Sequence, residues 1–181
     1  MCNKSKNKNT PKLSVVVAVD NNWGIGRNGE LLARVSCDLK QFRAITTGKT
    51  VILGSKTLAT FPGGRPLKNR RNIILSRRNG YCVEGAETAH SVDEVLSMLN
   101  DGEEAVVIGG ASVYEQMLPF CSVAYVTHFD RTFDGADAFF PNLDADTDWI
   151  MTSEGETLMT EENDMPNDMS YKFCVYERVT K

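Results

Sequence analysis

The chain has 181 residues, of which 41% are hydrophobic and 24% charged, values typical of a globular protein with one buried core. Its formal net charge of -4 includes an acid-rich stretch from Asp130 to Asp168, which disfavours nucleic acid as a partner. No apolar run approaches the roughly 20 residues that cross a bilayer, and residues 1–12 lack the apolar centre of a signal peptide. We therefore expect a cytoplasmic monomer without membrane contact, with a disordered basic tail (1–12) and one domain (13–181).

The cysteines and histidines argue against covalent cross-links and metal binding. The five cysteines are odd in number, widely scattered and without a CxxC spacing, and the only histidines are His90 and His128. Neither a disulfide framework nor a metal site is therefore expected. His128 falls in an apolar strand, and we interpret it as a core histidine.

The first half of the chain predicts buried strands and one long helix. Runs rich in Val, Ile and Leu predict strands at Leu13–Val19, Thr50–Gly54 and Asn72–Ser76. A stripe of apolar residues at helical spacing predicts a helix between the first two strands, with Ser36 as its N-cap. The stripe consists of Val35, Leu39, Phe42 and Ile45.

Asp38 is an acid on the first turn of this predicted helix. It lies four residues before Phe42, a spacing that places both side chains on one flank of a helix, so the carboxylate and the ring should border the same cleft. Alternatively, Asp38 only complements the positive end of the helix dipole. The local pattern leaves both interpretations open.

The second half continues the alternation of helices and strands. Ser91 and Glu94 form a capping box that predicts a helix ending near residues 100–102. A strand at Ala105–Ile108, a short helix at Ser112–Leu118 and a strand at Ser122–Phe129 should follow. Residues 130–142 read as a loop, and alternating side chains predict strands near 149–157 and 170–180. The pattern favours a single-domain α/β fold whose mostly parallel sheet ends in an antiparallel C-terminal strand.

Three glycine motifs suggest phosphate binding with different strength. Gly24, Gly26 and Gly29 spell GxGxxG, but the motif does not directly follow a strand and no helix opens on it, so it is not a dinucleotide fingerprint. Residues 48–50 match only the end of a P-loop and lead into a strand. Gly109 and Gly110 lie between a strand and a helix, where backbone N–H groups can bind phosphate, although a tight turn would also need glycine.

The order of motifs along the chain resembles the dihydrofolate reductase family. The matching segments are VVVAVDNNWGIGRNG (15–29), DLKQF (38–42), GGRPLKNRRNIILSRR (63–78), VIGGASVYEQMLP (107–119), YVTHFD (125–130) and DAFFP (137–141). The resemblance implies an eight-stranded, mostly parallel sheet with four flanking helices and a cis bond between Gly109 and Gly110. It also implies reduction of 7,8-dihydrofolate to tetrahydrofolate by NADPH, with antifolate inhibitors as further ligands.

The resemblance also assigns roles by position. Asp38 becomes the carboxylate that binds the pterin ring, and Thr127 the hydroxyl that supports it. The substrate-binding residues would be Val16, Ala18, Phe42, Arg70 and Ile108, with Arg70 clamping the α-carboxylate of the glutamate tail. The cofactor-binding residues would be Ala18, Ile25, Gly26, Lys56, Thr57, Ser76, Arg77, Arg78, Gly109, Gly110, Ser112 and Val113. Of these, Ile25 and Gly26 would lie on a mobile loop that closes over the pocket.

Some positions depart from the family pattern. Leu32 and Ala33 replace a usual Pro-Trp pair, so the indole beside the carboxylate is missing, and we expect water to fill the gap and weaken antifolate binding. Ser55 and Ser112 replace phosphate-binding arginines. Two alternatives therefore stay open: a reductase of the same fold that acts on another pterin or on a pyrimidine of flavin synthesis, and a non-catalytic binding protein.

Overall fold

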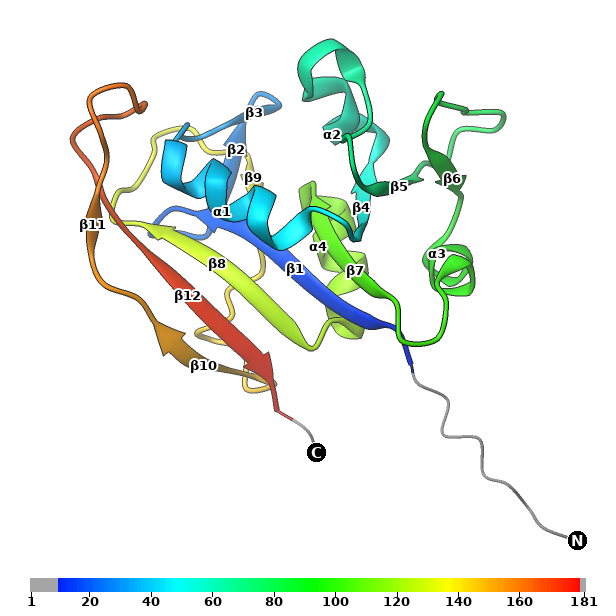
Figure 1. The fold of residues 1–181 in the computed structure, drawn as a ribbon. Helices are drawn as coiled ribbons and strands as arrows, with labels where there is room; N and C mark the ends of the chain where they lie inside the picture. The colour runs from blue at the N-terminus through cyan, green and yellow to red at the C-terminus, as the bar shows by residue number, and fades with distance from the viewer. Residues whose placement is uncertain (1–9, 180–181) are drawn as a thin grey trace, which may run out of the picture.

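The computed structural model describes residues 10–179, and its main feature is a twisted sheet with eight strands in a row (Figure 1). Across the sheet these are β10 (Trp149–Glu154), β12 (Ser170–Arg178), β8 (Val123–Phe129), β1 (Lys12–Val19), β7 (Glu104–Gly109), β4 (Thr50–Gly54), β5 (Arg71–Leu75) and β6 (Glu87–Ala89). The pairings from β8 to β6 are parallel, whereas β12 and β10 are antiparallel, and the short β11 (Leu158–Met159) pairs with β12. The predicted fold class is therefore confirmed.

Helices cover both faces of this sheet. They are α1 (Ser36–Thr46), α2 (Ser55–Thr60), α3 (Val92–Met98) and α4 (Ala111–Met117), with single 3-10 turns η1 (Pro62–Gly64) and η2 (Leu118–Phe120). In Figure 1, α1 crosses the near face in front of β1 and β8, and α4 lies behind β7. A second, small sheet of β3 (Glu30–Leu31), β2 (Gly24–Arg27) and β9 (Ala138–Phe139) lies at one end.

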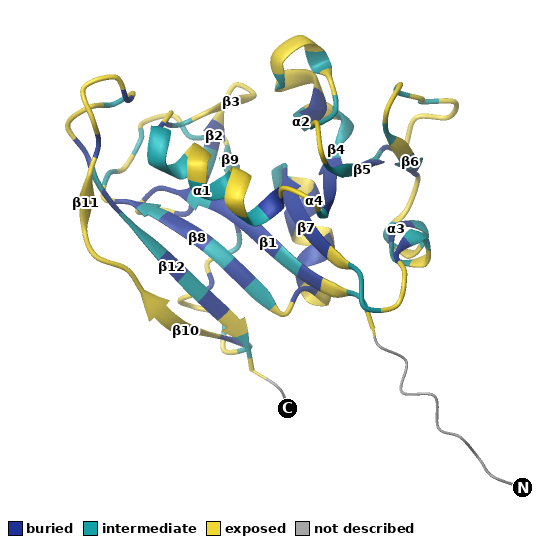
Figure 2. Cartoon of the chain, viewed as in Figure 1, coloured by how far each residue is buried: buried dark blue, intermediate teal, exposed yellow. Residues whose placement is uncertain are grey.

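The central strands are buried on both faces. Successive side chains point to opposite sides of the sheet, and helices cover each side. Val15 and Val17 join the core cluster that includes Met117 of α4. Val16, between them, joins the cluster on the other face, against which Phe42 of α1 packs. Figure 2 shows the consequence: the middle of the sheet is buried, while the outer side of the helices and the edge strand β10 are exposed.

The start of α1 differs from the prediction. Ser36 is the first helical residue and Val35 the N-cap, so the predicted Ser36 cap is wrong. The carboxylate of Asp164 takes over the capping function, because its Oδ1 accepts hydrogen bonds from the backbone N–H (2.8 Å) and the hydroxyl (2.7 Å) of Ser36. A hydrogen bond from the Glu161 N–H, followed by the two from Ser36, lowers the pKa of Asp164. A distant loop thus fixes the helix that carries Asp38.

Several short elements were not predicted. The helix α2 and the strands β2, β3, β6, β9 and β11 have two to six residues each. β9 lies inside the segment expected to be a loop, and Lys12, the last residue of the predicted tail, begins β1. Residues 1–9 of that tail lie outside the described residues. None of the helices within residues 10–179 is long and apolar enough to cross a membrane.

Candidate active site

Asp38 and Thr127 meet on the face of the sheet that α1 covers. The Thr127 hydroxyl donates a hydrogen bond to Asp38 Oδ1 at 2.6 Å, from the neighbouring strand β8. Burial raises the pKa of Asp38, and the hydrogen bond from Thr127 opposes this rise by stabilising the charged form. The two residues are 89 positions apart, so the fold and not the local sequence creates this pair.

The apolar residues predicted to line the substrate pocket lie around this carboxylate. Val16 and Ile108 belong to one buried cluster, and Phe42 packs against it one helical turn after Asp38. Ala18 lies in the adjacent cluster on the same strand as Val16. The structure therefore brings these apolar positions to one face of the sheet, next to the carboxylate of Asp38.

Ala33 is buried and packed against apolar side chains. It is only 8% exposed and lies in a cluster with Val35, Phe129, Met169 and Tyr171. Since burial raises the pKa of Asp38 in this setting, the carboxylate is desolvated even without an indole at position 33. The expected weakening of antifolate binding remains a prediction.

Arg70 lies at the other end of α1 and is already fixed by the protein. Its Nε donates to the Thr46 hydroxyl (2.9 Å), and its two terminal nitrogens donate to the Lys68 carbonyl (2.9 Å) and the Thr47 hydroxyl (3.2 Å). Burial and the nearby Arg43 lower the pKa of Arg70. A guanidinium has five N–H groups, so one further N–H on each terminal nitrogen stays available for a ligand.

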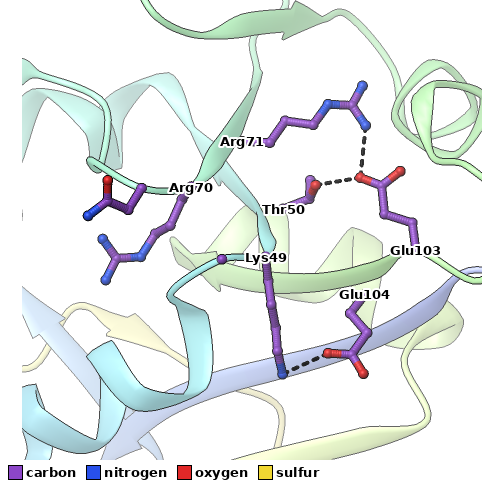
Figure 3. Close-up of a pocket in the computed structure, with 8 residues that line it drawn as sticks. Lys49, Thr50, Arg70, Arg71, Glu103 and Glu104 are labelled. Carbon is purple, nitrogen blue, oxygen red and sulfur yellow. Dashed lines mark hydrogen bonds and ion pairs between the residues drawn. The ribbon is translucent and has the colours of Figure 1, made fainter.

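A cavity of about 400 Å³ adjoins Arg70 where β4, β5 and β7 begin, but its other charges pair with each other. Lys49 contacts Glu104 at 3.0 Å, and Arg71 contacts Glu103 at 2.8 Å. Figure 3 shows these side chains turned toward one another while Arg70 points away from them. The charged side chains around this cavity are thus mostly engaged in ion pairs. Among the residues that line it, Arg70 alone was predicted to bind substrate.

At the opposite, carboxyl end of the parallel strands, Gly54, Gly109 and Gly110 leave the backbone without side chains, and we call these three residues the glycine cradle. The bond between Gly109 and Gly110 is cis, as the resemblance implied, and Gly109 has a φ of 115°, which favours glycine. A Cβ added at Gly110 would lie 3.0 Å from the Thr57 hydroxyl, and one at Gly54 3.1 Å from Val113. A side chain at either position would press on the first turn of α2 or α4, so the strand ends lie close to both helices.

The predicted phosphate-binding residues follow these strand ends. Ser76 is buried after β5, and Arg77 and Arg78 beside it are exposed. The Arg78 guanidinium lies 4.2 Å from the centre of the Tyr81 ring, a cation–π contact. Lys56 and Ser112 are exposed at the starts of α2 and α4, the two helices whose residues Thr57 and Val113 adjoin the glycines.

Ile25 and Gly26 lie in strand β2 of the small sheet. Gly26 pairs with Leu31 on one side and Ala138 on the other, and Ile25 packs against the main core. The Asn28 N–H donates to Asp137 Oδ2 at 2.8 Å, which fastens the end of this strand to the loop before β9. The predicted closing loop therefore has a regular, paired conformation in this structure.

Sequence reasoning missed two buried polar residues that organise the site. The Tyr114 hydroxyl donates to the Val16 carbonyl at 2.8 Å, directly beneath Gly109, and burial raises its pKa. Asp20 accepts hydrogen bonds from the backbone N–H groups of Asn22, Gly24 and Phe133. A tyrosine next to the glycine pair was visible in the sequence, but its partner is 98 residues away.

The arrangement defines a class of protein. Backbone without side chains at the carboxyl ends of parallel strands is typical of α/β enzymes that bind a nucleotide, and a half-buried carboxylate beside an apolar surface suits a small polar ring. Among the described residues, no group of three or more His, Cys, Asp or Glu side chains could hold a metal ion. The class is thus an α/β enzyme with adjacent nucleotide and substrate sites.

Comparisons with known proteins identify the family. The family model for dihydrofolate reductase matches residues 12–178. The dihydrofolate reductase of Neisseria meningitidis serogroup A is 38% identical over 92% of this chain and 98% of its own length, and that of Staphylococcus haemolyticus is 36% identical over 93% and 96%. The dihydrofolate reductase from Enterococcus faecalis complexed with NADP(H) and RAB-propyl superposes with a TM-score of 0.82 and 32% identity, covering 93% of this chain and 97% of that chain.

The chain belongs to the dihydrofolate reductase family. Membership confirms the predicted enzyme class, an NADPH-dependent oxidoreductase that converts 7,8-dihydrofolate to tetrahydrofolate in one-carbon metabolism. The family match therefore favours an enzyme over the alternative of a non-catalytic binding protein, which rested on the missing indole at position 33.

Proposed function

We propose that Asp38 binds and polarises the pterin ring of dihydrofolate, supported by Thr127. The observation that carries this proposal is the half-buried carboxylate with a hydroxyl donor at 2.6 Å on one oxygen. The pterin presents two neighbouring donors, the ring N3–H and the 2-amino group, and the two oxygens of an ionised carboxylate match them. A negative charge next to the ring also favours a protonated N5, which makes the adjacent carbon a better hydride acceptor.

The residues around Asp38 would exclude water and orient the ring. Val16, Phe42 and Ile108 supply apolar surface between the sheet and α1, the helix that carries Asp38. In a site with little water, the charge of Asp38 acts on the pterin with less screening. The proton for N5 would reach it through water, with Asp38 orienting the ring and not donating the proton itself.

Arg70 is proposed to bind the α-carboxylate of the glutamate tail. Two of its terminal N–H groups are free of the internal contacts described above, and a parallel pair of N–H donors matches the two oxygens of a carboxylate. The contacts with Thr46, Thr47 and the Lys68 carbonyl hold the guanidinium in place before substrate arrives. Binding then costs less side-chain entropy.

The residues at the strand ends fit a bound NADPH, which supplies the hydride. Support comes from the close, side-chain-free backbone at Gly109 and Gly110, where even a Cβ would contact its neighbours. Lys56, Arg77 and Arg78 are exposed cations at the ends of the flanking strands and suit phosphate groups. The remaining proposed cofactor contacts are Ala18, Ile25, Gly26, Thr57, Ser76, Ser112 and Val113.

We further propose that the enzyme works as a monomer in the cytoplasm and binds antifolates at Asp38. The four described cysteines are all free, which agrees with a reducing compartment. Diaminopyrimidine antifolates are cations that pair with a carboxylate, and Asp38 is the half-buried carboxylate that borders the apolar residues of the site. Size-exclusion chromatography with light scattering checks the monomer.

The test compares the parent chain with Asp38→Asn. The parent should oxidise NADPH when 7,8-dihydrofolate is added, followed by the absorbance of NADPH. Asparagine has one acceptor oxygen and no charge, so turnover at neutral pH should fall by orders of magnitude while circular dichroism stays unchanged. Turnover close to the parent would remove Asp38 from this role. A reduced pterin without a glutamate tail, offered to the parent, reports whether the tail is required.

A further inference from the structure

His90 forms a hydrogen bond with Ser76, the residue that precedes the proposed phosphate-binding arginines Arg77 and Arg78. Its ring Nδ1 lies 2.8 Å from the Ser76 carbonyl oxygen. A carbonyl oxygen can only accept, so Nδ1 carries the proton and donates it. The Ser76 N–H in turn donates to the Ala89 carbonyl at 2.9 Å. Ser76 is therefore held through both its N–H and its C=O by the two consecutive residues 89 and 90.

The N-terminus of α3 fixes His90 itself. The His90 N–H donates to Glu94 Oε2 at 2.6 Å, and the Glu94 N–H donates to the Ser91 hydroxyl at 3.1 Å. These are the two halves of the predicted capping box, with the Glu94 side chain reaching one residue further back than usual. His90 thus has a fixed backbone, and its ring bridges the helix α3 to Ser76.

On the other side, Ser76 sets the position of Arg78. The Arg78 N–H donates to the Ser76 hydroxyl at 3.3 Å, and the Arg78 guanidinium stacks on Tyr81. Ser76 is 4% exposed, whereas Arg77 and Arg78 are exposed. Because Ser76 is buried and hydrogen-bonded, the two exposed arginines that follow it are held in a defined position.

We propose that His90 is a positioning residue for the 2′-phosphate of NADPH. By holding the Ser76 carbonyl, the imidazole keeps Arg77 and Arg78 in the geometry that a phosphate requires. This inference rests on the proposed role of the two arginines and adds a residue that determines the preference for NADPH over NADH. Preorganised donors bind more tightly because less conformational freedom is lost on binding. The sequence motifs gave no indication of this role.

The experiment measures binding of NADP⁺ and NAD⁺ to the full chain by calorimetry. His90→Phe keeps a ring of similar shape but removes the donor. It should weaken NADP⁺ about 5- to 10-fold, the effect of roughly one hydrogen bond, and change NAD⁺ less than about 2-fold. His90→Asn, whose amide N–H occupies a place close to that of Nδ1, should restore most of the NADP⁺ affinity. The KM for NADPH, divided by the KM for NADH, should be lowest in the parent, slightly higher in His90→Asn and highest in His90→Phe.

A matched control separates positioning from stability. Ser91→Ala removes the acceptor that caps α3 without touching the His90 ring. It should lower the Tm and leave the ratio of NADP⁺ to NAD⁺ affinity unchanged. An equal loss of both cofactors in His90→Phe, or no loss, would overturn the inference. Because His90 is exposed, these variants should fold, and circular dichroism checks it.

The double variant Arg77→Ala with Arg78→Ala distinguishes failure of the inference from failure of the proposed site. If this variant loses discrimination but His90→Phe retains it, the arginines bind the phosphate and His90 does not position them. If the double variant still prefers NADP⁺, the 2′-phosphate lies elsewhere and both proposals fall. Loss of discrimination in both, with rescue by His90→Asn, supports both.

Discussion

Replacing Thr127 by valine should make Asp38 harder to ionise. Valine has nearly the shape of threonine, so the change removes the hydroxyl that donates to Asp38 Oδ1 at 2.6 Å and little else. A hydrogen bond to a charged group contributes about 1.5 to 3 kcal/mol, and about 1.4 kcal/mol is a factor of ten in an equilibrium constant. The ionisation constant of Asp38 should therefore fall about 10- to 100-fold.

The direction follows from the two opposing effects at this carboxylate. Burial raises the pKa of Asp38 and the Thr127 hydroxyl lowers it, so removal of the hydroxyl leaves burial unopposed and the pKa rises further. The measurement is an NMR titration of the Asp38 carboxyl carbon, with the pH profile of kcat/KM moving in the same direction. Thr127→Ser keeps the hydroxyl and should titrate like the parent. A pKa in Thr127→Val that matches the parent, or falls below it, would refute the reasoning.

Three other perturbations have defined outcomes. Arg70→Ala should raise the KM for dihydrofolate at least 10-fold with a much smaller effect on a tailless pterin, and steady-state kinetics with both substrates checks it. Ala33→Trp should tighten a diaminopyrimidine antifolate, measured by inhibition, and lower the Tm, because the indole enters a packed cluster; unchanged inhibition in a folded variant would contradict this. Hydrogen bonds from Thr50, Asn100 and Arg71 outweigh the effect of burial and lower the pKa of Glu103 from 4.5 to about 2. This lowering corresponds to about 3 kcal/mol, and solvent at the partly exposed Arg71 screens some of it. Glu103→Gln should therefore cost about 2 kcal/mol of stability at pH 7, and the deficit should shrink as pH falls from about 4.5 toward 2, as urea unfolding at several pH values will show.

The strands of the sheet centre were predictable because their burial on both faces demands uniform apolar runs. Val15, Val16 and Val17 show this: each is buried, yet they belong alternately to two clusters. The short elements were not predictable for the opposite reason. β6 has three residues and β9 two, too few for a period, and they are strands only because β5 and β2 offer them partners.

The site shows the same division between local and distant causes. The spacing of apolar residues predicts Asp38 on an early helical turn, but the same local pattern predicts Ser36 as the cap, which the structure contradicts. The cap comes from Asp164, which no local rule connects to α1. Thr127 entered only through the family resemblance, since nothing in its own strand marks it. Residues whose partners are distant in sequence need either the fold or a known relative.

The contact between Asp164 and Ser36 has a consequence for how the enzyme is made. It spans 128 positions, so a nascent chain on the ribosome exposes Asp38 long before the carboxylate that caps its helix has been synthesised. The strand that pairs beside Thr127 arrives later still, since Phe173 is its register partner. A chain halted before residue 164 already holds Thr127 on β8 beside β1, but it lacks the carboxylate that caps the helix of Asp38. Catalytic competence should thus appear abruptly once residues 164 to 173 have left the ribosome and not build up gradually.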